Sequence, residues 1–399
     1  MVDPAPLANP ALVPAHPREP LDPLSYVEDR DDLLPGNEVR LLRNGAEVFP
    51  AWLDAIRTAR ERISLEMYIF NDDTIGKRFG DALAAAAARG VTVRLLYDFI
   101  GCRDASPGFF PRLREAGVHV IAYHRYRLWR PRAWALFRRN HRKTLVCDGA
   151  VAFTGGLNIA DEWLSLADGG GGWKDAAVEV RGPAVNALEA VFLQTWNRRS
   201  PRRLQLDPSS LPTPALAGST PLAVVSNTEL RERFAIRRAA LHVLRESRHR
   251  IMLANPYFVP DGGILRALCQ AARRGVDVRV LVPEESDSLT LDFAGRATFA
   301  RLLAAGVRIF QNRAVVHTKA LTVDDIFASI GSYNLDHRSL AYNLEVVVNA
   351  IDAGLAAAVS RMLDADMAEG EEIRAEDFAQ RSIFARLLEY LAYGLRRWL

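Results

Sequence analysis

Apolar and polar residues follow two spacings along this chain, one typical of buried strands and one typical of helices. Short apolar runs occupy residues 63–70 (ISLEMYIF) and 91–98 (VTVRLLYD), and a helical pattern through 81–90 separates them. The helical patterns close with Arg-Gly or Ala-Gly, which favours a helix end. Alternation of such segments predicts an α/β fold with parallel-type sheets covered by helices.

The same order of elements returns in the second half of the chain. An apolar run at 250–260 precedes a helical pattern over 264–275, and the strand pattern of 276–283 matches that of 91–98. Residues 116–124 (AGVHVIAYH) pair with 305–313 (AGVRIFQNR) in the same way. An internal repeat of this length predicts two homologous halves.

The domain boundaries follow from composition, because 399 residues suit two domains better than one. Residues 1–35, rich in proline and charge, are expected to form a flexible lead, and 36–200 the first domain. Residues 201–222 collect Pro, Ser and Arg and are expected to be a linker. The second domain is expected over 223–370, and an amphipathic C-terminal helix over 371–399.

Two segments favour contact with a lipid surface. The C-terminal segment carries an apolar stripe with arginines nearby: Ile383, Phe384, Leu387, Leu388, Leu391, Leu395, Trp398 and Leu399, with Arg386, Arg396 and Arg397. Between Arg125 and Lys143 lie eight cations, no acids and four aromatic residues. A helix docked on the core and a solvated basic loop are the alternatives.

Composition narrows the class of protein. Apolar residues make up 49% and charged residues 25% of the chain, as in folded soluble proteins, and the net charge of +3 leaves the kind of partner to local charge. Three cysteines without a CxxC pair favour a reducing compartment. The N-terminus lacks a secretory pattern, and no apolar run reaches the roughly eighteen residues of a membrane span. Any membrane contact is expected to be peripheral.

One motif with candidate chemistry occurs twice. The first half reads HRKTLVCDGAVAFTGGLN and the second reads HTKALTVDDIFASIGSYN, with the same relative spacings. The matching residues are His141, Lys143, Asp148 and Asn158 in the first copy, and His317, Lys319, Asp324 and Asn334 in the second. Chance seldom satisfies such a pattern twice in register with a wider repeat.

The motif suits chemistry on a phosphate. On a strand, His-x-Lys places both side chains on one face, because side chains alternate. A histidine serves as nucleophile or proton carrier, a lysine offers charge to phosphate oxygens, and an asparagine adds neutral donors. If the halves pack about a pseudo-twofold axis, His141 and His317 face each other across one phosphate, with Lys143, Lys319, Asn158 and Asn334 around it.

Further residues complete the predicted site. Asp175 and Glu345 occupy equivalent places in the two downstream strands, and we assign them as carboxylates that orient the histidines. Asp148 and Asp324 belong to the motif's catalytic set by position, but a structural role is expected for them. The remaining histidines show no metal-ligand spacing, so no metal is predicted.

The doubled HxKxxxxD motif with Gly and Asn following resembles the phospholipase D superfamily, over residues 40 to 350. The resemblance implies two homologous α/β domains with helix-covered mixed sheets about a pseudo-twofold axis. It also implies a phosphohistidine intermediate and no metal or other cofactor. His141 is then the nucleophile and His317 the acid and later the base, and the reverse assignment remains open.

Within that superfamily, the segments 66–70 (EMYIF), 256–260 (PYFVP) and 334–345 (NLDHRSLAYNLE) are similar to bacterial cardiolipin synthases of the short type without transmembrane helices. This implies transfer of a phosphatidyl group from phosphatidylglycerol to the headgroup hydroxyl of a second phospholipid, with release of glycerol. Phospholipids and an anionic membrane surface are the expected partners, at the cytoplasmic face of the bacterial inner membrane. Cys102 and Asp175 depart from the family pattern.

Two other functions compete with phosphatidyl transfer. A phosphodiesterase or nuclease of the same superfamily would need a basic track with stacking aromatics, which the Arg125 to Lys143 run could supply. A noncatalytic lipid-binding protein would not need two intact catalytic sets. No nucleic-acid partner is expected, and the sequence does not indicate an oligomeric state.

Overall fold

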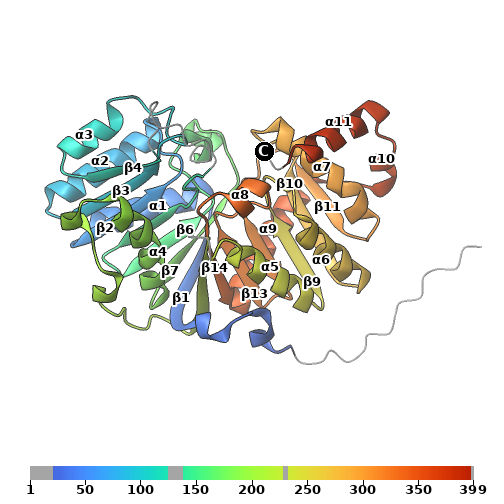
Figure 1. The fold of residues 1–399 in the computed structure, drawn as a ribbon, viewed down its shortest axis with the longest axis horizontal. Helices are drawn as coiled ribbons and strands as arrows, with labels where there is room; N and C mark the ends of the chain where they lie inside the picture. Colours follow the sequence, from blue (N-terminus) through green and yellow to red (C-terminus); the bar gives the residue numbers. More distant parts are fainter. Residues whose placement is uncertain (1–20, 125–137, 228–231, 397–399) are drawn as a thin grey trace, which may run out of the picture.

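The computed structural model describes residues 21–124, 138–227 and 232–396. The strands form one 15-stranded sheet in the order β15-β11-β10-β9-β12-β13-β14-β8-β1-β7-β6-β5-β2-β3-β4. The first half of the chain, blue to green, lies beside the second half, yellow to red, with helices against both parts of the sheet (Figure 1). The predicted α/β class is confirmed.

Each half contributes seven strands in the same order. The first half has β1 (Leu34–Arg43), β7 (Ala176–Arg181), β6 (Val151–Gly155), β5 (Thr144–Cys147), β2 (Arg62–Met67), β3 (Thr92–Asp98) and β4 (His119–Tyr123). The second half has β8 (Thr220–Ser226), β14 (Val346–Ile351), β13 (Phe327–Gly331), β12 (Ala320–Val323), β9 (Arg250–Ala254), β10 (Asp277–Pro283) and β11 (Arg308–Asn312), followed by the short β15 (Glu371–Glu372).

The described helices follow the same order in both halves, except that the second half has one additional short helix before β14. Those of the first half are α1 (Asn44–Thr58), α2 (Thr74–Ala88), α3 (Phe109–Glu115) and α4 (Ala184–Arg199). Those of the second half are α5 (Ala235–Glu246), α6 (Gly262–Arg273), α7 (Leu289–Leu303), α8 (His337–Ala341) and α9 (Ala353–Ala368), before α10 (Ala375–Ala379) and α11 (Ile383–Gly394). No helix in the described part of the chain is long and apolar enough to cross a bilayer.

Within each half, only some neighbouring strands of the sheet are parallel. In the first half β2, β3 and β4 pair in parallel, whereas β5, β6 and β7 pair antiparallel. The connection from β5 to β6 is a tight turn in which Asp148 and Gly149 have φ of 54° and 63°. So short a connection cannot cross over to a parallel neighbour, which makes the sheet mixed.

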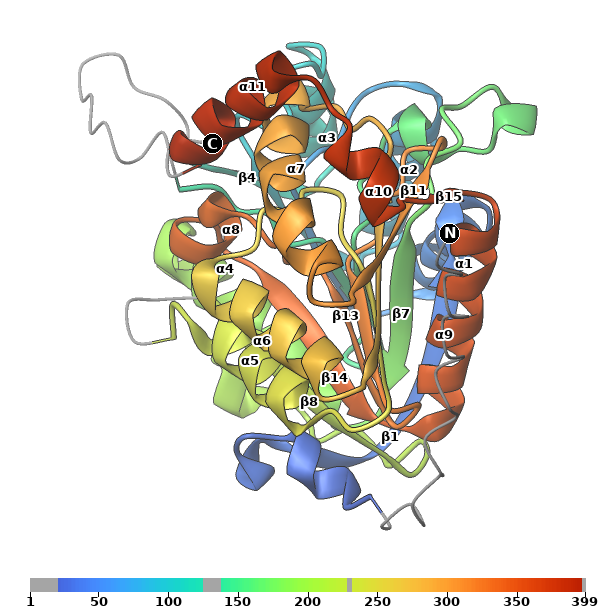
Figure 2. The ribbon, with the colours of Figure 1, turned by 90° about the vertical axis from the view of Figure 1, so that its right-hand side faces the viewer.

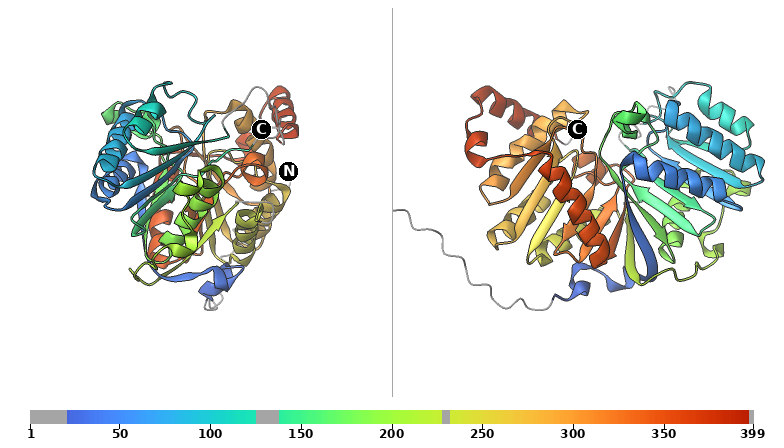
Figure 3. Two further views of the ribbon diagram at one scale, coloured as in Figure 1. Left: turned by 60° about the vertical axis from the view of Figure 1, so that its left-hand side comes forward. Right: turned by 180° about the vertical axis from the view of Figure 1, so that it is seen from behind.

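The two halves share one apolar interface. β1 and β8 pair antiparallel at the centre, where β1 is visible between the lobes from behind (Figure 3). Residues of β7 and β13, such as Val178 and Ile330, belong to the same buried cluster. α9 runs beside β1 on the outside of this junction (Figure 2). The extensive shared core holds the halves, and the residues at their edges, in a fixed relation.

Three expected segments differ in detail. The described part of the lead is ordered, since Tyr26 is 2% exposed in the core of the second half and its hydroxyl donates to Asp324 over 2.7 Å. β8 begins at Thr220, inside the expected linker. The described part of the segment expected to be one helix, 371–396, holds β15 and two helices, because Glu372 pairs with Arg308 on β11 and Ser382 caps α11. Most of the basic aromatic run, 125–137, lies outside the described residues.

Candidate active site

A cavity of about 630 Å³ lies between the two halves, and both predicted histidines line it. Its wall combines Tyr68, Arg139, His141, Asn158, Trp163 and Trp173 of the first half with Tyr257, Asp287, His317, Asn334, Asp336 and Arg338 of the second half. The cavity therefore brings together the two histidines and the two asparagines that the sequence singled out.

Each histidine lies on an extended segment that leads into a strand, not within the strand itself. His141 precedes β5, and its N–H donates to the carbonyl of Leu344 over 3.0 Å. His317 precedes β12, and its N–H donates to the carbonyl of Lys174 over 2.7 Å. In both cases the partner segment belongs to the other half, so backbone contacts across the junction fix the two motifs.

The orienting carboxylates are exchanged between the halves. Nδ1 of His141 lies 3.0 Å from Glu345 of the second half. Nδ1 of His317 lies 2.6 Å from Asp175 of the first half. A carboxylate only accepts hydrogen bonds at neutral pH, so each Nδ1 carries the proton and each Nε2 keeps its lone pair. The structure thus places both carboxylates on the histidines, with partners that the sequence did not specify.

The two carboxylates have different surroundings. Glu345 accepts hydrogen bonds from the hydroxyls of Ser332, over 2.5 Å, and Ser339, over 2.7 Å. Asp175 accepts from the indole N–H of Trp163 over 2.9 Å. In the repeat, Gly156 takes the place of Ser332, and a Cβ there would lie 2.1 Å from the Asp175 carboxylate. Glycine at 156 is therefore required for the close approach of Asp175.

Burial changes the acidity of this cluster. It lowers the pKa of both His141 and His317 from 6.5 to about 4, with the ammonium groups of Lys143 and Lys319 adding to the effect and the carboxylates opposing it. Burial also lowers the pKa of Lys319 to about 8 and that of Lys143 in the same direction. Burial would raise the pKa of Glu345, but His141 and Lys143 hold it below its usual value. Both imidazoles are consequently neutral at pH 7.

The lysines and asparagines surround the two rings. Lys143 donates to the carbonyl of His141 over 2.7 Å, and Lys319 donates to the carbonyl of His317 over 2.5 Å. Nζ of Lys319 also lies 2.8 Å from Nδ1 and 3.0 Å from Nε2 of His317. Oδ1 of Asn158 accepts the N–H of Ile69 over 3.1 Å, which leaves its NH₂ group for a ligand. Oδ1 of Asn334 is buried, and no donor among the described residues reaches it. Both asparagines line the cavity, and the two buried ammonium groups add positive charge near it, so the place suits an anion.

The motif aspartates lie away from the cavity. Asp148 accepts the backbone N–H groups of residues 60–62, and Asp324 those of residues 248–250. Both stand in the turn after a motif strand, at the end opposite the histidine, with φ of 54°. Although the motif groups them with the catalytic residues, their geometry matches the structural role expected from the sequence.

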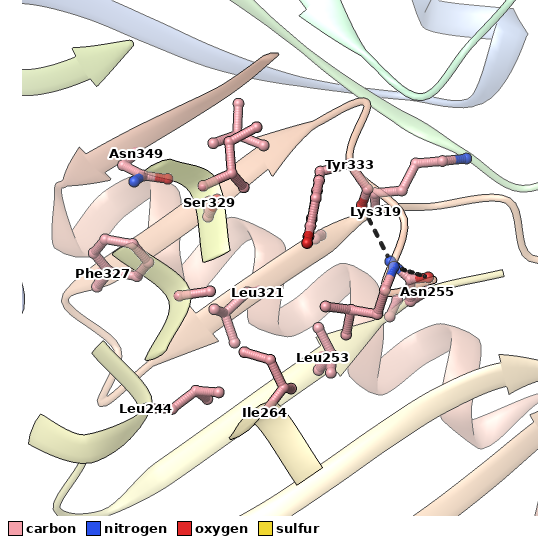
Figure 4. Close-up of a pocket in the computed structure, with 16 residues that line it drawn as sticks. Leu244, Leu253, Asn255, Ile264, Lys319, Leu321, Phe327, Ser329, Tyr333 and Asn349 are labelled. Atoms are coloured by element: carbon pink, nitrogen blue, oxygen red, sulfur yellow. Dashed lines mark hydrogen bonds between the residues drawn. The ribbon is translucent and has the colours of Figure 1, made fainter. Parts of the chain in front are cut away.

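A small cavity of about 60 Å³ lies behind Lys319 in the second half (Figure 4). Asn255 borders it, donates to the carbonyl of Tyr333 over 3.3 Å and accepts the N–H of Leu335 over 3.1 Å. These two bonds enclose Asn334 and fix its backbone at the active-site wall. The cavity is too small for a lipid chain.

Several residues of the site were not predicted. The rings of Tyr68 and His141 meet edge to face at 4.7 Å, and Trp163 and Trp173 lie 5.1 and 5.6 Å from the ring of His317. Tyr68 directly follows β2, at the carboxyl end of a parallel strand, where ligands of α/β sheets bind. An aromatic residue directly after a predicted strand is the sequence feature that could have identified Tyr68. The same feature could have identified Tyr257, near the end of β9.

Two buried imidazoles, each held by a carboxylate from the other half and accompanied by a lysine, define a phosphodiester-transfer site built from two copies of one motif. The family described as "Cardiolipin synthase, PLD-like domain" matches residues 52–196 and 240–367. The chain belongs to this family, which lies within the phospholipase D superfamily. The expectation of a phosphatidyltransferase of this superfamily is confirmed at the level of the family.

Individual relatives agree with this assignment. The cardiolipin synthase of Geobacillus thermodenitrificans is 37% identical over 347 residues, which cover 86% of this chain and 69% of that protein. The major cardiolipin synthase ClsA of Bacillus subtilis is 32% identical over 355 residues, 88% of this chain and 73% of that one. Phosphatidylserine synthase of Haemophilus influenzae shares the fold, with a TM-score of 0.67, 13% identity, and coverage of 90% of this chain and 93% of that one.

Proposed function

We propose that this protein is a cardiolipin synthase, which transfers a phosphatidyl group from phosphatidylglycerol to the headgroup hydroxyl of a second phospholipid and releases glycerol. The observation that carries the proposal is the meeting of His141 and His317 in one cavity, in a chain of the cardiolipin synthase family. One site with two imidazoles provides both a nucleophile and a proton carrier.

In the first step Nε2 of His141 attacks the phosphorus of phosphatidylglycerol. A bond forms between nitrogen and phosphorus, the bond to the glycerol oxygen breaks, and protonated His317 gives its proton to that oxygen. Lys143 and Lys319 neutralise the nonbridging oxygens, and Asn158 and Asn334 donate to them. Glycerol leaves, and a phosphatidyl group remains on His141.

In the second step His317 acts as the base. It takes the proton of the incoming hydroxyl while that oxygen attacks phosphorus, and the bond to Nε2 of His141 breaks. His141 is assigned as the nucleophile because the ammonium of Lys319 lies 2.8 Å from Nδ1 and 3.0 Å from Nε2 of His317, which makes the ring of His317 the poorer nucleophile. Burial keeps His317 neutral, and the negative charge of the entering phosphate favours its protonated form.

A phosphatidyl-transfer assay tests this function. Purified protein with labelled phosphatidylglycerol in detergent is expected to form cardiolipin and glycerol, also in the presence of a chelator. His141→Ala should abolish both products, whereas His119→Ala, on β4 and outside the cavity, should leave turnover unchanged. Formation of phosphatidic acid alone would mean that the protein hydrolyses phosphatidylglycerol and does not transfer its phosphatidyl group. Full activity of His141→Ala would refute the mechanism.

We also propose that α11 attaches the protein peripherally to an anionic membrane. The helix packs on α7, whose Leu291 lines the active-site cavity. Glu389 of α11 is buried at 3% exposure and pairs with Arg381, while Phe384 is 85% exposed and Leu387 55%. An apolar face turned outward beside the site suits insertion among acyl chains.

The cytoplasmic face of the bacterial inner membrane is the proposed location. Cys102, Cys147 and Cys269 are all buried and unpaired, which fits a reducing compartment. Vesicle flotation with phosphatidylglycerol tests the membrane contact. Phe384→Ser with Leu387→Ser should weaken binding at least about tenfold. Leu166→Ser is the control: it alters a 77% exposed residue outside α11 and should not weaken vesicle binding. Equal binding of all variants would refute the role of α11.

A further inference from the structure

The active-site cavity is not symmetric, although its two halves are. Beside His141 lie Tyr68 and two guanidinium groups, those of Arg139 and Arg338. Beside His317 lie Trp163 and Trp173. One side of the cavity therefore carries two guanidinium groups, with the carboxylates of Asp98 and Asp336 close enough to act on them, and the other side is aromatic.

The two arginines come from different halves and are brought together by backbone pairing. The carbonyl of Arg139, two residues before His141, accepts the N–H of Leu344 over 2.8 Å. Arg338 lies in α8, and its carbonyl accepts the N–H groups of residues 342 and 343, directly before that junction. The pairing that delivers Glu345 to His141 thus also delivers Arg338 to Arg139.

The pair lies close together in a partly desolvated place. Arg139 is 5% exposed, and its pKa is lowered by burial and, in addition, by the charge of Arg338, while Asp98 opposes the shift. Burial raises the pKa of the Tyr68 hydroxyl, and the charges of both guanidinium groups oppose that rise. Arg139 is buried and Arg338 is partly buried, and their like charges repel, so an anion bound between the two guanidinium groups would be stabilised.

Neither arginine has a counterpart at the matching position of the other half. Arg139 stands two residues before His141, and the residue two before His317 is Val315. Arg338 stands four residues after Asn334, and the residue four after Asn158 is Glu162. The duplicated motif serves the reacting phosphate on both sides, so a feature present on one side alone must serve something that the reaction uses once.

We propose that Arg139 and Arg338 bind the phosphate of the acceptor phospholipid, the one that does not react. The inference rests on the proposed function, in which two phospholipids enter one cavity. When phosphatidylglycerol is the acceptor, its hydroxyl and its phosphate lie at the two ends of one glycerol. An acceptor whose hydroxyl reaches the phosphohistidine therefore holds its own phosphate within the same cavity.

Guanidinium groups suit that ligand. They form paired hydrogen bonds to phosphate oxygens and lose less hydration than an ammonium group. The cavity of about 630 Å³ has room for two headgroups. An acceptor recognised by its phosphate is also held in place for attack, which favours lipid over a free alcohol or water.

Two reactions of the same enzyme separate the acceptor subsite from the reacting site. Exchange of labelled glycerol into phosphatidylglycerol needs one phospholipid, whereas cardiolipin formation needs two. Arg338→Gln is expected to lower cardiolipin formation at least about tenfold, the effect of losing a charge-assisted hydrogen bond, and to leave glycerol exchange within about twofold. Arg139→Gln should act in the same direction, and Arg338→Lys should restore part of the activity.

The controls distinguish the possible failures. Arg57→Gln removes the same charge from an exposed position on α1, and should change neither reaction. Equal losses of exchange and synthesis in Arg338→Gln, or no loss in either, would overturn the subsite while leaving the proposed function intact. Absence of both reactions in the unaltered protein would overturn the proposed function, and the subsite with it. Thermal melts identify any variant that is misfolded.

Discussion

Replacement of Glu345 by glutamine probes the contact on which the proposed nucleophile depends. The side chain is fully buried, does not line the cavity and accepts the Nδ1 proton of His141 at 3.0 Å. Glutamine keeps the size but loses the charge. Its NH₂ group can also turn toward Nδ1, which would move the imidazole proton to Nε2, the atom that must attack phosphorus.

The size of the effect follows from these two changes. Loss of a hydrogen bond to a charged group costs about 1.5–3 kcal/mol, or roughly tenfold to a hundredfold in rate. The wrong tautomer adds to this loss, and the equivalent exchange in Ser-His-Asp enzymes lowers kcat about 10⁴-fold. We therefore expect kcat of Glu345→Gln to fall by about 10² to 10⁴, with KM for phosphatidylglycerol changed less than about threefold.

Initial rates of cardiolipin formation over a range of phosphatidylglycerol concentrations give both constants. Glu179→Gln is the matched control, because it makes the same change in a carboxylate of β7 that pairs with Arg40 and Arg181 outside the cavity. Its activity should stay within about twofold. A folded Glu345→Gln protein that keeps more than half of its kcat would refute the orienting role of Glu345.

Three further outcomes are expected. The folded pKa of His141 and His317, about 4, lies below the unfolded value of 6.5, so their contribution to stability is complete above pH 6.5 and is lost as the pH falls toward 4. At pH 5 the free energy of unfolding is lower by about 2 kcal/mol for each histidine. Thermal melts at pH 7 and pH 5 should therefore show a smaller loss of stability for the His141→Asn, His317→Asn double variant than for the unaltered protein. Equal losses in the two proteins would contradict this. Gly156→Ala should lower phosphatidyl transfer at least about tenfold, because the methyl group meets the Asp175 carboxylate, whereas Gly108→Ala meets nothing within 4 Å and serves as control; equal activities would exclude the steric argument. Tyr26→Phe should lower the free energy of unfolding in urea by about 1 kcal/mol without changing turnover, and an unchanged stability would exclude the hydrogen bond to Asp324.

The sequence predicted the fold class and repeat because periodic apolar patterns record which faces are buried. It also placed His141 and His317 in equivalent positions, and the structure puts both rings on one cavity. The pairing of Glu345 with His141 and of Asp175 with His317 could not be read from the chain. Exchange between the halves is a property of how the two halves pack, and local spacing contains no information on that packing.

Other features of the structure could not be predicted from the sequence for related reasons. Tyr26 is apolar and aromatic within a segment rich in proline and charge, so composition indicated a flexible lead although the ring fits the second core. Arg139 and Arg338 are separated by 199 positions in the chain, and only the pairing of residues 140 and 344 makes them neighbours. The domain boundaries at 200 and 223 stay a prediction.

The exchange of carboxylates explains how a duplicated motif can hold two different roles. Each histidine is oriented only when the halves are docked, since its acceptor and its backbone partner both come from the other half. Asp175 lies 2.6 Å from His317 and favours the protonated ring that an acid needs. Glu345 also accepts hydrogen bonds from the hydroxyls of Ser332 and Ser339, whereas Asp175 accepts one from the indole N–H of Trp163. Because burial lowers the pKa of both rings to about 4, we propose that these unequal surroundings act together with the entering phosphate to give the two histidines their different roles.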